Sequence, residues 1–345
     1  MKNKIIIAIS VIISVFLLLS LLFVSSKILI PKSTNPRERG LIKEYYDEVE
    51  IGREHQVIFI GDCEVYESFT PPTLWNEYGI TSYIRGSAQQ LIWQSYYLLY
   101  EVFEYESPEI VVFNVLSLKY GKPQKEEYNR LTLDGMKNSS IKHNAIKASI
   151  TKDESVLSYY FPILRYHSRW KDLTKDDYIY AFYDEKVSHN GYLMMTNIEP
   201  KVENREPEGL IDYTLPEICF EYLDKMYTLC KNNGAELILI KAPTNSYNYW
   251  WYDEWDKQVL EYAKSLGISY YNFIDNEEIG IDWSTDTYDA GVHLNVYGAQ
   301  KLTSYFGNIL INNHNIKPID PKNTSDVWQE KYKRFINEEE LQKNQ

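Results

Sequence analysis

Five short apolar segments alternate along the chain with segments that have helical periodicity. Strands that alternate with amphipathic helices predict right-handed crossovers, which place the strands side by side in a parallel sheet. We therefore expect an α/β fold, a three-layer sandwich in which helices cover both faces of a five-stranded parallel sheet. The expected strands are residues 56–60, 81–84, 108–115, 235–243 and 268–273, and the expected helices are residues 72–78, 89–104, 216–232, 255–266 and 297–311.

The alternation is interrupted between the third and the fourth expected strand. Residues 116–210 are polar, aromatic and irregular, and they follow the carboxyl end of the third strand. Ligands of such sheets bind at that edge, so this insertion is a candidate lid or substrate platform. Its aromatic stretch "YYFPILRYHSRW" indicates either a sugar-binding surface or a local core beneath a lid.

The amino-terminal segment is apolar enough to cross a membrane. Residues 5–24 contain no charged side chain, and about twenty apolar residues span the hydrocarbon core of a bilayer as a helix. A clear small-x-small cleavage site is missing, which favours an uncleaved signal anchor. Basic residues flank both ends, so the charge bias does not fix the orientation. Because an apolar segment this close to the start usually directs the downstream chain across the membrane, we expect a single-pass membrane protein with an extracytoplasmic body.

These features divide the chain into four predicted parts. A transmembrane signal anchor at residues 1–26 is followed by a polar stalk at residues 27–54, with a short helix at residues 41–49. The α/β domain is expected at residues 55–315, and residues 316–345 read as a polar C-terminal tail.

Composition limits the classes of partner and cofactor. The formal net charge of −13 argues against nucleic acid as a partner, because phosphate binding needs a basic surface. Three cysteines are too few for a disulfide framework. No histidine pair has the spacing of metal ligands, so we expect no metal ion and no other cofactor.

Two segments carry residues suited to nucleophilic chemistry. Cys63 follows the first strand and a Gly61-Asp62 pair, in a turn that would expose its thiol above the sheet. The alternative is a small buried apolar residue, which is common for free cysteine. Asp289 and His293 lie in the loop before the last helix, where the carboxylate can reach a ring nitrogen and orient the imidazole. The alternative for His293 is a surface or capping role.

These two segments resemble conserved blocks of a known superfamily. "VIFIGDCEVYESF" resembles the first block of the SGNH (GDSL-like) hydrolases, with cysteine in place of serine, and "DAGVHLNVYGAQKL" is similar to their last block. "SYIRGSAQQ" and "IVVFNVLSL" fall where the second and third blocks are expected. The resemblance frames residues 56–311 and implies a flavodoxin-like SGNH fold with a large insertion after the third strand. It is closest to the membrane-anchored branch that includes alginate O-acetylation proteins and the D-alanylation proteins of teichoic acid synthesis.

The resemblance implies a catalytic triad. Cys63 would be the nucleophile, His293 the general base and Asp289 the residue that orients the histidine. The sequence departs from the family pattern in the spacing of this pair, which is separated by three residues rather than two. Asp286 in the same loop is therefore an alternative acid.

The resemblance also implies donors for an oxyanion. The backbone N–H groups of Gly86 and Cys63 would bind it, with Asn114 as a third donor and Gln89 as an alternative. The segment around Asn114 lacks the glycine that usually precedes the family asparagine, so this side chain could instead face away from the site.

The resulting hypothesis is a membrane-tethered, extracytoplasmic SGNH-type esterase or O-acyltransferase that acts on a cell-envelope glycan through an acylated cysteine. Its expected partners are a cell-envelope polysaccharide or a teichoic-acid-like polymer, together with a membrane-bound acyltransferase. Two alternatives are open. One is a catalytically inactive scaffold that binds glycan or the acyltransferase, and the other is an esterase of soluble lipids.

Overall fold

The computed structural model describes residues 2–31, 41–183, 186–202, 207–246, 249–319 and 321–343. The chain divides into two compact units. The smaller unit combines Met1–Pro36 with Lys152–Lys186, and the larger unit combines Arg37–Thr151 with Val187–Gln345. Part of the predicted insertion therefore belongs to the same unit as the amino-terminal helix.

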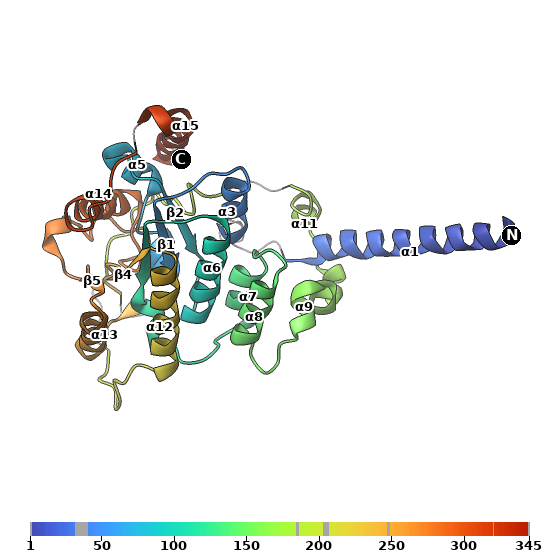
Figure 1. Ribbon diagram of the computed structural model, residues 1–345, viewed down its shortest axis with the longest axis horizontal. Coiled ribbons are helices and arrows are strands. Elements are labelled where there is room, and N and C mark those ends of the chain that lie inside the picture. The colour runs from blue at the N-terminus through green and yellow to red at the C-terminus, as the bar shows by residue number, and fades with distance from the viewer. Residues whose placement is uncertain are drawn as a thin grey trace. The chain divides into compact units, whose positions relative to one another are not determined.

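The larger unit contains the predicted five-stranded parallel sheet, in the order β2-β1-β3-β4-β5 (Figure 1). Every neighbouring pair of strands is parallel. The α/β class and the parallel sheet are thus confirmed. The strands are β1 (Val57–Gly61), β2 (Ser82–Gly86), β3 (Ile110–Asn114), β4 (Glu236–Lys241) and β5 (Ser269–Asn272).

Two groups of helices accompany the sheet. Helix α6 contacts α12, whereas α5 contacts α14 and α15. Phe306 of α14 packs in one core with Phe59 of β1 and Phe69, so apolar side chains of the last long helix cover the central strand. The helices are α5 (Pro71–Tyr78), α6 (Ile92–Tyr105), α12 (Glu217–Asn232), α13 (Asp253–Leu266), α14 (Val296–Asn313) and α15 (Pro321–Lys343).

Two segments outside the predicted domain contribute to its core. Residues 41–49, expected as part of the stalk, form helix α3 (Leu41–Val49), and its Tyr45 is buried against the guanidinium of Arg85. Residues 321–343, expected as a polar tail, form α15, and Phe335 of this helix is fully buried. Both segments are rich in charged residues. Their few apolar residues lie on one face of each helix, and this face is buried, but so few apolar positions give only a weak signal in the sequence.

The region between β3 and α12 contains short helices up to Ile179, and its described residues from Tyr180 to Pro216 are irregular. The 3₁₀ helix η1 (Val115–Lys119) directly follows β3, and α7 (Glu126–Leu133) and α8 (Ser140–Ser149) belong to the larger unit. The remaining elements belong to the smaller unit and are α9 (Val156–Tyr160), α10 (Ile163–Tyr166), η2 (His167–Lys171) and α11 (Lys175–Ile179).

The smaller unit also contains α1 (Lys2–Leu29), the predicted amino-terminal helix. Its segment Asn3–Leu29 has a mean hydropathy of 3.1 and is long and apolar enough to cross a membrane. Helices α10, η2 and α11 contact α1.

Candidate active site

The turn after β1 holds Cys63 at the edge of the sheet formed by the carboxyl ends of the strands. Gly61 has φ +154°, and a Cβ atom there would lie 2.7 Å from Cγ2 of Val65, so a side chain would not fit. Asp62 caps the short helix α4 (Cys63–Tyr66) by accepting a hydrogen bond from the backbone N–H of Glu64 at 3.2 Å. Cys63 is the first residue of this helix, and only 5% of it is exposed.

His293 lies in the loop between β5 and α14, held by Asp289. One carboxylate oxygen of Asp289 accepts the His293 backbone N–H at 2.8 Å, and the other lies 2.7 Å from Nδ1 of the ring. Asn295 then caps α14 by accepting the backbone N–H of Tyr297 at 3.1 Å. The Asp289 carboxylate therefore holds both the backbone of the loop and the orientation of the imidazole.

A second carboxylate, from Glu67, faces the same ring nitrogen. Its Oε2 lies 3.2 Å from Nδ1 of His293, and its Oε1 accepts a hydrogen bond from the Tyr288 hydroxyl at 2.9 Å. Glu67 was not among the residues predicted from the sequence. The available signal was its position four residues after Cys63, which places both side chains on one side of a helical turn.

The Cys63 thiol and the His293 imidazole each shift the pKa of the other. Burial raises the pKa of Cys63, and His293 opposes that increase. For His293, burial lowers the pKa, but Glu67, the Cys63 sulfur and Asp289 outweigh it, so that the pKa lies well above its ordinary value. With Nδ1 facing two carboxylates, Nε2 is the remaining nitrogen, and it is buried without a hydrogen bond to any described residue. Two segments 230 positions apart thus converge at one edge of the sheet.

Tyr249, from the loop after β4, completes the surroundings of the sulfur. Its hydroxyl lies 3.3 Å from Sγ of Cys63, and its ring meets the His293 ring edge-on at 5.3 Å between centroids. Burial raises the pKa of this phenol far above its usual range, so it stays protonated. In the sequence, Tyr249 belongs to the aromatic stretch "NSYNYWWYDEW", which indicates a sugar-binding surface or a local core rather than a contact with the nucleophile.

The predicted oxyanion donors lie around the same turn. Gly86 pairs with Gly61 in the sheet, and a Cβ atom at Gly86 would lie 3.1 Å from the Gly61 carbonyl oxygen. Gln89 has φ +51° and is exposed at the cavity that contains Cys63. Asn114 is buried, and its Nδ2 donates to Asp62 at 3.1 Å and to Glu64 at 2.9 Å. Binding of an oxyanion by the Asn114 amide, which stays a prediction, would require one of these bonds to break.

A buried charged network supports the turn. Nζ of Lys241 lies 2.8 Å from each carboxylate oxygen of Glu64, and both side chains are almost completely buried. Burial raises the pKa of Asp62 to about 7, with Glu64 adding to the increase and Lys241 opposing it. The Asn114 carbonyl oxygen also accepts the Ala242 backbone N–H at 3.0 Å. These bonds join the ends of strands β1, β3 and β4 next to the turn that carries Cys63.

Asp286, the alternative acid, has other partners. Its Oδ2 lies 2.6 Å from Nζ of Lys301 and accepts the Asp282 backbone N–H at 2.8 Å. Asp289 is thus the member of this pair that lies against the imidazole.

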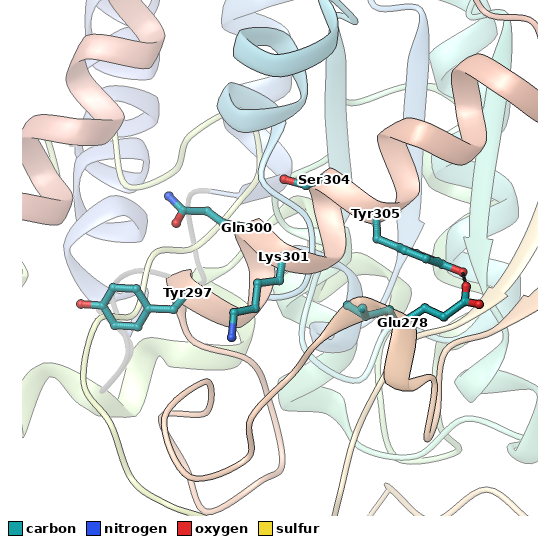
Figure 2. Close-up of a pocket in the computed structure, with 7 residues that line it drawn as sticks. Glu278, Tyr297, Gln300, Lys301, Ser304 and Tyr305 are labelled. Atoms are coloured by element: carbon teal, nitrogen blue, oxygen red, sulfur yellow. Dashed lines mark hydrogen bonds between the residues drawn. The ribbon is translucent and has the colours of Figure 1, made fainter.

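Two hollows lie on the larger unit. A cavity of about 320 Å³ is lined by Asp62, Cys63, Gln89, Gln90, Leu116, Tyr120, Tyr249 and Val292. A more open pocket of about 580 Å³ lies along α14 and η4 (Glu277–Ile279) (Figure 2), where the Tyr305 hydroxyl donates to Glu278 at 2.8 Å. None of the predicted site residues lines this second pocket. Within the described part of the chain, no group of three or more His, Cys, Asp or Glu side chains is arranged to hold a metal ion.

Comparison with known proteins adds one finding. A protein-family model matches residues 212–315, a segment that includes Asp289 and His293 but not Cys63. This match covers less than half of the chain. No curated protein matches the sequence.

Proposed function

We propose that this protein is an SGNH-type acyl hydrolase or acyltransferase that works through an acylated Cys63. The observation that carries the proposal is that a thiol, an imidazole and two carboxylates gather at one sheet edge. Tyr249 contacts both the Cys63 sulfur and the His293 ring, and the carboxylates of Asp289 and Glu67 lie against Nδ1 of that ring. A nucleophile next to a base that a third group orients is the general signature of covalent acyl transfer. In this proposal the sandwich is of the SGNH type, and residues 116–210 are its insertion.

The reaction begins with attack of the Cys63 thiolate on an ester carbonyl carbon, with the thiol proton held by His293. The carbonyl oxygen becomes an oxyanion, which the backbone N–H groups of Cys63 and Gly86 stabilise. Collapse of this intermediate breaks the bond to the alcohol, which leaves with the proton from His293, and a thioester remains on Cys63. Water or a sugar hydroxyl then attacks the thioester, His293 accepts its proton, and the acid or the new ester is released while the thiol is restored.

Carboxylates on Nδ1 suit this cycle because they stabilise the imidazolium that forms twice in it. The apolar helix α1 is consistent with work at a membrane, and in this proposal the body is extracytoplasmic, as the apolar segment predicts. The sequence resemblance points to a cell-envelope polysaccharide or teichoic-acid-like polymer as the acyl acceptor or donor. A membrane-bound acyltransferase is the proposed source of acyl groups in the transfer mode.

Trapping of the acylated cysteine tests the proposal. The full chain is incubated briefly with p-nitrophenyl acetate, quenched in acid and examined by mass spectrometry. We expect one acetyl group on Cys63 in the wild type, none in Cys63→Ala and strongly reduced acetylation in His293→Ala. Asp286→Asn serves as the matched control, because it removes a carboxylate of the same loop that lies against Lys301.

The rival function is a scaffold that binds without turnover, and the burial that raises the Cys63 pKa favours it. A Cys63 that stays unacetylated, and that iodoacetamide labels only after denaturation, would establish the scaffold and refute the enzyme.

A further inference from the structure

Large apolar side chains gather on the surface of the smaller unit, within residues 156–183. We call this segment, which comprises α9, α10, η2, α11 and the turn after α11, the collar. Single exposed apolar residues are ordinary, but a concentration of them marks a surface that something else covers. Phe161 is 58% exposed, Phe182 62% and Trp170 65%. The full set is Leu157, Phe161, Leu164, Trp170, Tyr178, Ile179, Tyr180, Phe182 and Tyr183.

The collar is attached to the last turn of α1 by defined contacts. Nη1 of Arg169 donates to the carbonyl oxygen of Leu29 at 2.6 Å, and Nη2 donates to Asp177 at 3.0 Å. Nζ of Lys27 lies 5.6 Å from the centroid of the Phe182 ring. Helix α11 lies beside the C-terminal end of α1 (Figure 1). One arginine thus joins the free carbonyl at the end of α1 to the collar.

The exposure of the α1 side chains decreases at the end of the helix that contacts the collar. Residues 21–24 are exposed, residues 25–28 are partly covered, and Leu29 is buried. The twenty uncharged residues 5–24 span about 30 Å at 1.5 Å per residue, which is the thickness of a hydrocarbon core. The collar therefore contacts the helix at the level where it would leave the hydrocarbon.

We propose that the collar is a membrane-interface anchor, whose exposed aromatic and aliphatic side chains enter the headgroup region of the bilayer around the end of α1. Tryptophan and tyrosine are enriched at that depth because one part of each ring system is apolar and another is polar. Lys27 fits the same depth, since long basic side chains reach from apolar surroundings to polar headgroups. The proposal is independent of the chemistry at Cys63.

The charge of the collar indicates whether its binding depends on anionic lipids. Residues 156–183 contain four basic residues (Arg165, Arg169, Lys171 and Lys175) and three acidic ones (Asp172, Asp176 and Asp177). Such a balance gives little attraction to anionic lipids. The collar is therefore expected to insert through its apolar side chains, to the same depth in neutral and in anionic bilayers.

Depth measurement by nitroxide labels tests the anchor. The full chain, with Cys63→Ser, Cys219→Ala and Cys230→Ala so that no native thiol takes the label, is reconstituted in phosphatidylcholine vesicles. Single labels are placed at Phe161→Cys, Leu164→Cys and Trp170→Cys, and at Lys264→Cys on the exposed face of α13 as the control. Accessibility to oxygen, which concentrates in the bilayer, is compared with accessibility to a water-soluble nickel complex. All label positions are exposed, because surface substitutions seldom perturb folding. Three separate positions are used so that the result does not depend on one variant.

We expect oxygen to be favoured over the nickel complex several-fold at the collar positions, relative to the Lys264 position. The depth should be the same in vesicles that contain phosphatidylglycerol. Water-like accessibility at all three positions would overturn the proposal, and so would protection from both reagents, which would mean that protein covers this surface. Insertion only in the anionic vesicles would refute the apolar mode of binding.

Discussion

Replacement of Glu67 by glutamine isolates the contribution of the second carboxylate at Nδ1. The substitution keeps the size of the side chain and an oxygen that can accept from Tyr288, but it removes a buried negative charge 3.2 Å from the ring. Asp289 at 2.7 Å still orients the imidazole. An opposite charge at such distances typically shifts a pKa by about 1 to 3. The pKa of His293 should therefore fall by about 1 to 3 in the variant, a loss of about 1.4–4 kcal/mol of imidazolium stabilisation.

Two measurements report this change. Proton-coupled NMR of ¹³C-labelled histidine gives the pKa of His293 directly, after assignment with His293→Gln. The rate of Cys63 alkylation by iodoacetamide reports the thiolate that the imidazolium stabilises. Near neutral pH it should fall by less than about tenfold for each pKa unit that His293 loses, because removal of the Glu67 charge also lowers the pKa of the thiol directly. Glu261→Gln on the exposed face of α13 is the control for net charge and should change neither measurement. An unchanged His293 pKa in Glu67→Gln would refute the two-carboxylate reasoning.

Three further predictions concern the loop and the network. In the acetylation assay, Asp289→Asn should reduce the acylation rate far more than Asp286→Asn, and equal losses would show that the loop as a whole matters rather than the contact with Nδ1. Lys241→Met should lower the free energy of unfolding by about 3–5 kcal/mol because it leaves Glu64 as an unpaired buried charge; denaturant titration should show recovery when Glu64→Gln is added. Because the pKa of His293 in the folded protein lies above the unfolded value of about 6.5, its stabilisation should be complete below that pH and disappear as pH rises through the folded-state pKa. A wild-type advantage over His293→Gln that grows with pH would contradict this sign.

The sheet was predictable because its signals are local. Strands β1, β3 and β4 are short apolar runs, and the segment around β3 needed no information beyond its own residues. The pairing of Cys63 with Asp289 and His293 could be expected only through the resemblance, since no local pattern connects positions 230 residues apart. Their roles in catalysis remain predictions.

Other parts of the site depend on packing that no local pattern encodes. Glu67 looks like a solvent-facing glutamate in the sequence, and only the approach of the His293 loop makes it a ring partner. Asn114 looks available in the sequence, yet Asp62 and Glu64 occupy its amide. Helices α3 and α15 were not predicted as part of the domain because a few buried apolar residues decide their packing, whereas the rest of each helix is polar.

The Glu64–Lys241 pair has an evolutionary consequence. Exchange of either partner alone would strand a charge in the protein interior, so an intermediate with one substitution would be selected against. Asn114 extends the constraint, because its amide bridges Glu64 and Asp62 while its carbonyl oxygen holds β4. Among descendants of this gene, these positions should therefore covary or stay fixed as a block. The sulfur at position 63 lies outside this block. The proposed nucleophile could therefore be exchanged between lineages while the buried pair and Asn114 stay unchanged.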